Sequence, residues 1–213
     1  MSYKDPKEFE SGELDNMTAA LTKMLDRIVN EFKNESERHL VILGSAKLED
    51  LLFNLLERRL LESPTNNDTL FRGTGALSTF SARSEMAYRL GLISKPFLDA
   101  LNSIRKVRNE FAHQFDASLL EGGNEERISQ LVSGIKETKA FQHVTNSYFG
   151  TESTTRTQLC AMLTLLILRL EGAVLRVERI QSSLPVELIP ADWGAAIAIG
   201  AAIQETVRRA ETE

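Results

Sequence analysis

Residues Ser94–Gln114, SKPFLDALNSIRKVRNEFAHQ, carry both the helical pattern and the polar motif around which the chain is organised. Ser94 can accept a hydrogen bond from a free N–H of a first helical turn, and Pro96 lies where a missing donor costs little. Apolar residues then recur at helical spacing: Phe97, Leu98, Leu101, Ile104, Phe111, Ala112 and Phe115. The segment is therefore predicted to be an amphipathic helix that ends near His113.

Three polar residues of this helix need an explanation. At 3.6 residues per turn, Arg108 projects from the middle of the apolar stripe, while Asn109 and His113, four apart, lie together on one flank. A guanidinium keeps its charge, so Arg108 requires acceptors or a water-filled cleft. In a structural interpretation, Arg108 pairs with a carboxylate, for which Glu49 is the candidate, and His113 interacts with the negative end of its own helix. In a functional interpretation, Arg108, Asn109 and His113 form a site.

Composition limits the classes of protein that fit the chain. It has 213 residues, of which 42% are hydrophobic, enough for one domain with a sizeable core. The formal net charge of −5 argues against a dedicated binder of duplex DNA, which usually has a basic surplus. Between Arg58 and Arg108, however, nine basic residues stand against four acidic ones. That local surplus of positive charge permits an anionic ligand.

No metal, cofactor or membrane is indicated by the sequence. Cys160 is the single cysteine and lies in an apolar run, which predicts a small buried side chain and excludes a disulfide framework or a zinc-ligand spacing. The first residues, MSYKDPKEFE, lack the apolar stretch of a signal peptide. The longest apolar runs are shorter than the roughly 20 residues that span a bilayer. A cytoplasmic protein is expected.

Helical periodicity recurs along most of the chain, and no stretch alternates convincingly enough to predict a strand. The predicted helices span residues 14–32, 37–61, 79–91, 94–113, 124–135, 153–181 and 192–209. The second is apolar over a wide arc and should be central, and its Gly44 and Ser45 indicate a close crossing with another backbone. The helix at 153–181 has a heptad-like stripe that suits either an antiparallel neighbour in the same bundle or a dimer seam, and we favour the bundle.

The predicted fold class is therefore all-α, a multi-helix bundle. Residues 1–12 are expected to form a flexible N-terminus, and residues 13–183 the bundle domain. Residues 184–213 are expected to form a helical extension packed on that bundle. No internal repeat is present.

Three segments together resemble the MltR family, named for the mannitol operon repressor. They are Leu77-Ser-Thr-Phe-Ser-Ala-Arg, Tyr88-Arg-Leu-Gly-Leu-Ile-Ser and Ile104-Arg-Lys-Val-Arg-Asn-Glu-Phe-Ala-His. The resemblance implies an all-helical bundle that lacks a recognised DNA-binding motif and acts in transcriptional regulation. With the acidic net charge, it favours a repressor or co-regulator that works through a protein partner. The segment after His113 departs from the Asp-rich continuation associated with the family.

Arg108-Asn109-x-x-x-His113 is also similar to the Arg-x(4–6)-His signature of HEPN domains, helical modules found in toxins and RNA-processing enzymes. In HEPN ribonucleases this implies a metal-independent cleavage in which the RNA 2′-OH attacks the adjacent phosphate. His113 would then transfer a proton, Arg108 would stabilise charge on the phosphate, and Asn109 would orient either group. Two copies facing each other across a dimer would make the more credible site.

The interpretation that follows is an MltR-like regulatory module, homodimeric and acting through a protein partner. The alternative is a HEPN-type endoribonuclease or an inactive relative of one, and only that alternative requires RNA as a substrate.

Overall fold

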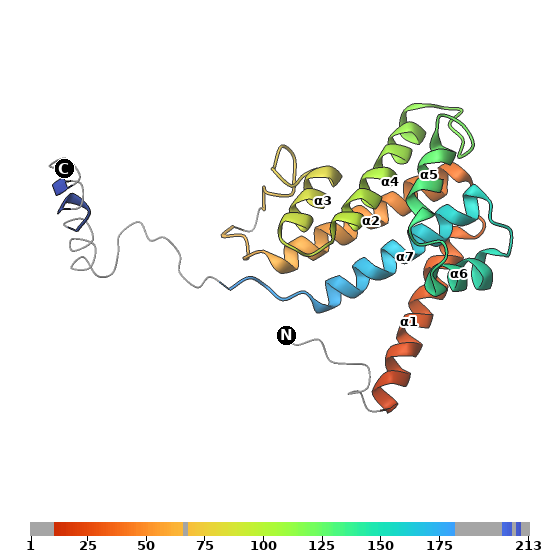
Figure 1. The fold of residues 1–213 in the computed structure, drawn as a ribbon, viewed down its shortest axis with the longest axis horizontal. Helices are drawn as coiled ribbons and strands as arrows, with labels where there is room; N and C mark the ends of the chain where they lie inside the picture. Colours follow the sequence, from red (N-terminus) through yellow and green to blue (C-terminus); the bar gives the residue numbers. More distant parts are fainter. Residues whose placement is uncertain (1–10, 66–67, 182–201, 206–207, 210–213) are drawn as a thin grey trace. The chain divides into compact units, whose positions relative to one another are not determined.

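Helix is the only regular secondary structure in the part of the chain that the structure describes. The computed structural model describes residues 11–65, 68–181, 202–205 and 208–209, and no strand occurs among them. The elements, shown in Figure 1, are α1 (Ser11–Phe32), α2 (Glu37–Arg59), α3 (Phe80–Arg89), α4 (Lys95–His113), α5 (Asn124–Ser133), α6 (Lys139–Val144), the π-helical turn η2 (Thr145–Phe149) and α7 (Thr155–Arg176). The prediction of an all-α fold is confirmed.

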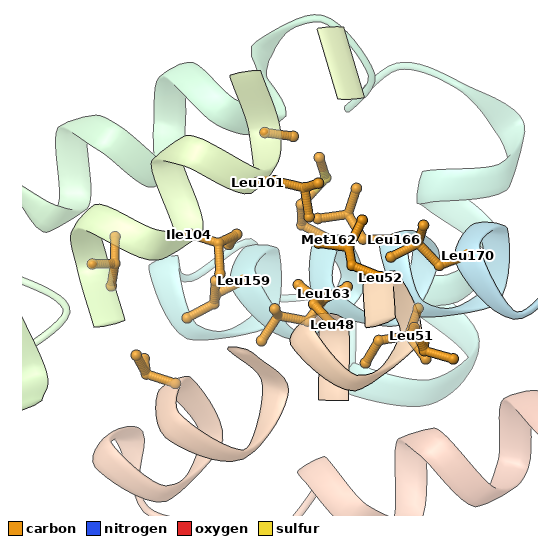
Figure 2. Close-up of a cluster of buried hydrophobic side chains, with 14 of the residues drawn as sticks. Leu48, Leu51, Leu52, Leu101, Ile104, Leu159, Met162, Leu163, Leu166 and Leu170 are labelled. Carbon is orange, nitrogen blue, oxygen red and sulfur yellow. The ribbon is translucent and has the colours of Figure 1, made fainter. Parts of the chain in front are cut away.

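Helix α2 is central, as its wide apolar arc predicted. It packs against α7, α3 and α4. One side-chain cluster joins these helices, and Figure 2 shows Leu48 and Leu52 of α2 beside Leu163 of α7, with Leu101 and Ile104 of α4 nearby. Burying this many branched side chains is the main favourable term for such a fold.

The close crossing predicted at Gly44 is present, but its partner is a side chain. A Cβ atom added to Gly44 would lie 2.7 Å from Cδ1 of Leu163 in α7. The neighbouring Ser45 is buried, and its hydroxyl donates to the carbonyl of Val41 at 2.7 Å. Gly44 therefore makes room for the leucine rather than for a backbone.

Helix α7 lies within the same compact unit, and its stripe is used against the chain itself. It packs against α2, α5 and α1. The helix is long and apolar enough to cross a membrane by those two criteria, but 56% of its apolar window is buried in the fold, which is also typical of a core helix in a soluble protein. Its end differs from the prediction, because α7 stops at Arg176 and not near Gln181. Near this end, Arg58 in the last turn of α2 donates to the Val174 carbonyl at 3.2 Å.

The chain divides into two compact units, residues 1–180 and residues 181–213. Helix α1 begins at Ser11, two residues inside the segment predicted to be flexible, and residues 1–10 lie outside the described part. Of the predicted helix at 192–209, the structure describes 202–205 and 208–209, which are helical. Between α5 and α7 lie α6 and η2, and at the start of α6 the Thr138 hydroxyl accepts from the Phe141 N–H at 3.3 Å.

Candidate functional site

Helix α4 forms where its capping residues predicted. The Ser94 hydroxyl accepts a hydrogen bond from the Phe97 N–H at 3.4 Å, and Pro96 lies in the first turn. The prediction that Arg108 projects from the middle of the apolar stripe is wrong, because its side chain is exposed. Val107, which is 1% exposed, occupies the middle of the buried arc with Ile104. One residue is about 100° around a helix, so Arg108 falls at the edge of that arc.

The side chain of Arg108 bonds to its sequence neighbour. Its Nη1 donates to Oδ1 of Asn109 at 3.2 Å, and no carboxylate among the described residues pairs with it. The interpretation of Arg108 as a sealed ion pair therefore fails. Arg108 and Asn109 do lie together, as the sequence motif required.

His113 lies apart from Arg108 and Asn109 and does not contact them through a hydrogen bond. It is the last residue of α4, its side chain is exposed, and no described residue forms a hydrogen bond or ion pair with it. The carbonyls at the end of α4 are bound instead by Arg38 of α2. Arg38 donates to the carbonyl of Phe111, to that of Gln114 at 2.7 Å and to that of Phe115 at 2.6 Å. Sequence analysis missed Arg38, since nothing local indicates that the first turn of α2 meets the end of α4.

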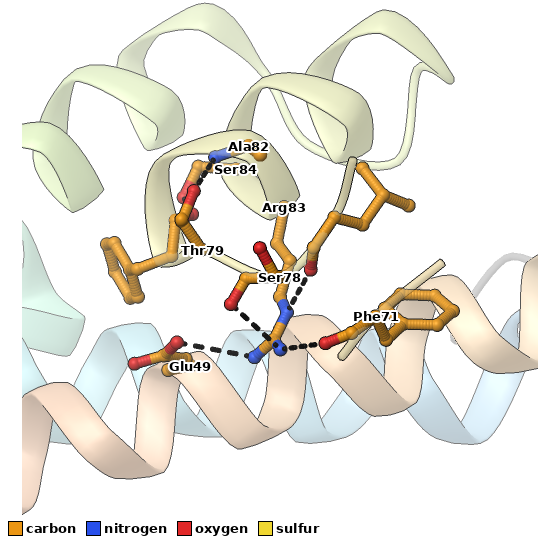
Figure 3. Close-up of polar contacts among 9 residues, drawn as sticks. Glu49, Phe71, Ser78, Thr79, Ala82, Arg83 and Ser84 are labelled. Atoms are coloured by element: carbon orange, nitrogen blue, oxygen red, sulfur yellow. Dashed lines mark hydrogen bonds and ion pairs between the residues drawn. The ribbon is translucent and has the colours of Figure 1, made fainter. Parts of the chain in front are cut away.

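Glu49 does pair with an arginine, but the partner is Arg83 and not Arg108. The Arg83 Nη1 to Glu49 Oε1 distance is 3.3 Å, and the two side chains are 12% and 28% exposed. Figure 3 shows that the same guanidinium reaches the connection before α3, where it donates to the carbonyls of Leu77 at 2.8 Å, Phe71 at 3.3 Å and Ser78 at 3.4 Å. Arg83 thus fastens the connection between α2 and α3 onto α2.

A cleft of about 490 Å³ opens beside this ion pair. We call it the α2–α3–α4 cleft, after the helices that supply its lining: Ser45 and Glu49 of α2, residues 78–81 at the start of α3, and Arg105, Arg108 and Asn109 of α4. Residues from three helices thus meet at one opening. His113 is not among the lining residues.

Positive charge in the cleft is not neutralised by the described part of the chain. Arg105 forms no hydrogen bond or ion pair with any described residue, and its buried Nε atom has no acceptor. A buried polar group without a partner is costly, and such a group in a native protein calls for an explanation. Arg105 and Arg108 are three residues apart, so both project from one face of α4.

The start of α3 supplies further donors to the same opening. Thr79 is the N-cap of α3, and its hydroxyl accepts from the Ala82 N–H at 3.2 Å. The first N–H groups of a helix have no partner within it. Here the N–H groups of Phe80 and Ser81 bond to no described residue. The cleft therefore combines two arginines with the positive end of a helix.

Metal and thiol chemistry find no support in the described residues. No group of three or more His, Cys, Asp or Glu side chains there could hold a metal ion. Burial raises the pKa of the Cys160 thiol to about 11, so it stays protonated and unreactive near neutral pH. The lining of the α2–α3–α4 cleft suits the binding of an anion.

The class that fold and site define is an all-helical protein with a cationic cleft. Comparison of the chain with protein-family models, curated proteins and solved structures gave no match.

Proposed function

We propose that this chain is a helical regulatory module that acts by binding, as a transcriptional repressor or co-regulator that works through a protein partner, and that it is not an enzyme. The observation that carries the proposal is the separation of Arg108 and His113. Arg108 lines the α2–α3–α4 cleft with Asn109, whereas His113 is exposed and outside the lining. The imidazole that the ribonuclease alternative needs is therefore not among the residues that line the cleft with Arg108. The MltR-like motif residues support the regulatory part of the proposal.

The surface proposed for the partner is the end of α4 and the residues after it. Phe115 is 95% exposed, two residues beyond His113, while Arg38 holds its backbone in place. Exposed aromatic side chains on a fixed backbone are typical centres of protein interfaces. We expect the module to work as a homodimer, which sedimentation of the purified protein will test.

The test uses cells that lack the protein. Wild-type protein should restore a defined set of transcripts, and Phe115→Ser should fail to restore them although it folds and melts like the wild type. Leu175→Ser is the matched control, since Leu175 is 70% exposed on α7, and it should restore them fully. Unchanged transcripts in the deletion, or full restoration by Phe115→Ser, would refute the proposal.

Direct reading of duplex DNA is not part of the proposal. With a net charge of −5, the purified protein should bind duplex DNA weakly, and that binding should collapse as salt rises. A tight, sequence-selective gel shift at physiological salt would contradict this expectation.

One contact favours the alternative function, a HEPN-type endoribonuclease. Arg108 and Asn109 are hydrogen-bonded at the edge of an open cleft, as a phosphate-binding pair would be. Under this alternative, expression of the wild type fragments RNA and His113→Ala abolishes the cleavage. His143→Ala is a matched control, because His143 is also exposed. We expect that the wild type does not cleave RNA. Cleavage that is lost in His113→Ala and kept in His143→Ala would favour the enzyme.

A further inference from the structure

We propose that the α2–α3–α4 cleft is a binding site for a small-molecule phosphate monoester. The phosphate group would lie between Arg105, Arg108 and the first turn of α3, and the rest of the ligand would fill the remainder of the cleft. This inference goes beyond the proposed function. It assigns a ligand to a site that a protein partner does not require.

The two arginines of the cleft have donors that the described residues leave unused. Arg105 has no acceptor among the described residues, not even for its buried Nε, and Arg108 has only the amide oxygen of Asn109. Arg38 and Arg83, by contrast, are bound to carbonyls and, for Arg83, to a carboxylate. A guanidinium presents a planar fork of donors that matches phosphate oxygens two at a time. Two such forks with unused donors in one cleft suit an anionic ligand.

The first turn of α3 supplies further unused donors to the cleft. The N–H groups of Phe80 and Ser81 lack partners among the described residues, and both residues line the cleft. Helix N-termini bind phosphate because their free N–H groups and the helix dipole both favour negative charge. The helix is 10 residues long, enough for its peptide dipoles to add. Donors from α3 and α4 therefore face one opening.

Charge balance favours a phosphate monoester over a carboxylate. Glu49 is the acidic residue of the lining, and Arg83 offsets it at 3.3 Å. Arg105 and Arg108 then leave about two positive charges for a ligand. A phosphate monoester carries a charge of about −1.5 to −2 at pH 7 and offers three acceptor oxygens. A carboxylate or a phosphodiester carries only one negative charge and would leave the other arginine uncompensated.

Cleft size favours an ester over inorganic phosphate. The volume of about 490 Å³ lies within the range of about 300–1,000 Å³ typical of small-molecule sites. Polar residues other than the arginines also line the cleft, including Ser45 and Glu49. A carboxylate accepts hydrogen bonds, so Glu49 would bind a hydroxyl or amine of the ligand body. The Arg83–Glu49 pair would position that acceptor.

Calorimetric titration of the purified full chain with glycerol 2-phosphate is the test. The wild type should bind it with one site per chain. Arg105→Gln and Arg108→Gln should each weaken the affinity by about tenfold or more, the effect of losing charge-assisted hydrogen bonds. Lys106→Gln is the matched control, because it removes the same charge from an exposed position on α4 outside the lining. Its affinity should stay within about twofold of the wild type, since an exposed charge acts only weakly on a ligand it does not touch.

A second pair of variants tests the N–H group at the start of α3. Phe80→Pro and Phe80→Ala both remove the ring, but only proline also removes the N–H. Thr79 has an extended backbone (φ −109°, ψ 152°), which is the conformation that a following proline requires. Phe80→Pro should therefore fold like Phe80→Ala and bind glycerol 2-phosphate several-fold more weakly. Circular dichroism checks that both variants remain helical.

Other probes separate this site from its alternatives. Dimethyl phosphate and acetate should bind at least about tenfold more weakly than glycerol 2-phosphate, because each carries one charge fewer. Binding that Lys106→Gln weakens as much as Arg108→Gln does would show a diffuse charge effect and overturn the proposal. Absence of glycerol 2-phosphate binding, or tighter binding of a phosphoserine peptide or of inorganic phosphate, would overturn it as well.

Discussion

The fit between α2 and α7 at Gly44 can be tested by adding one methyl group. A Cβ atom at position 44 would lie 2.7 Å from Cδ1 of Leu163 and 3.2 Å from its Cδ2. Leu163 is fully buried, in the cluster shown in Figure 2, so its side chain cannot swing into solvent. Gly44→Ala therefore forces one of the two helices or the leucine to shift.

Two effects of opposite sign act in Gly44→Ala. Replacing glycine by alanine within a helix stabilises it by about 1 kcal/mol. Overpacking a well-filled core costs about 1–3 kcal/mol. The net expectation is a destabilisation of about 0–2 kcal/mol, in contrast to the gain that helix propensity alone would give.

Leu163→Ala removes the obstacle and so isolates the packing term. Alone, it should lower the free energy of unfolding by about 2–5 kcal/mol, because it leaves a cavity. With Leu163 truncated, the methyl group of Gly44→Ala has space, and only its helix-stabilising effect remains. The double variant should therefore be more stable than the sum of the single effects predicts, by about 1–3 kcal/mol.

Urea unfolding followed by circular dichroism measures these free energies, provided that the dependence on urea is unchanged among the variants. Gly172→Ala is the matched control. Gly172 lies in α7, where an added Cβ would be 3.3 Å from the flexible end of Arg176. It should stabilise the protein slightly and combine additively with Leu163→Ala, since the two sites are far apart along the helix. A Gly44→Ala variant as stable as Gly172→Ala, or additivity within about 0.5 kcal/mol in the Gly44–Leu163 cycle, would refute the packing argument.

Three further predictions follow from individual contacts. Arg83→Leu should cost about 2–4 kcal/mol in urea unfolding and expose residues 71–78 to proteolysis, because it strands Glu49 and releases three carbonyls; an intact connection would contradict it. Arg38→Ala should lower the free energy of unfolding by about 1–3 kcal/mol, because it removes the donor to three carbonyls at the end of α4. Arg27→Ala, which removes an exposed ion pair with Glu31, should lower it by less than about 0.5 kcal/mol. Equal losses would rule out a capping role for Arg38. The pKa of Cys160 is raised from 9.0 to about 11, so its thiol should resist a disulfide reagent at pH 8 until urea unfolds the chain. The contribution of the buried thiol to stability should be complete below pH 9 and lost as the pH rises towards 11. Rapid labelling of the native protein would contradict the burial argument.

Local patterns in the sequence were sufficient to predict the helices that surround the cleft. Ser94 caps α4 as predicted, and α3 begins at Phe80, one residue after the predicted start at 79. The central position of α2 followed from its wide apolar arc. These features depend on residues within a few positions of one another, where spacing and backbone preference fix the outcome.

Contacts between helices could not be predicted in the same way. Glu49 was a reasonable acid for an arginine, but which of the nearby arginines it meets depends on how α3 lies across α2. The cap at the end of α4 comes from Arg38, 73 residues before Phe111. Helical periodicity says which face of a helix is buried and carries no information about the helix that covers it.

The candidate site also combines features that the sequence determined with features that only the fold decided. The sequence by itself determined that Arg108, Asn109 and His113 share the end of one amphipathic helix, because helical spacing fixes their relative positions. Only the tertiary structure decided that Arg108 joins Arg105 in a cleft against α2 and α3 while His113 stays outside it. The physical reason is that the edge of the buried arc, where Arg108 lies, is set by which helices pack on α4, and the spacing of residues within α4 does not specify those helices.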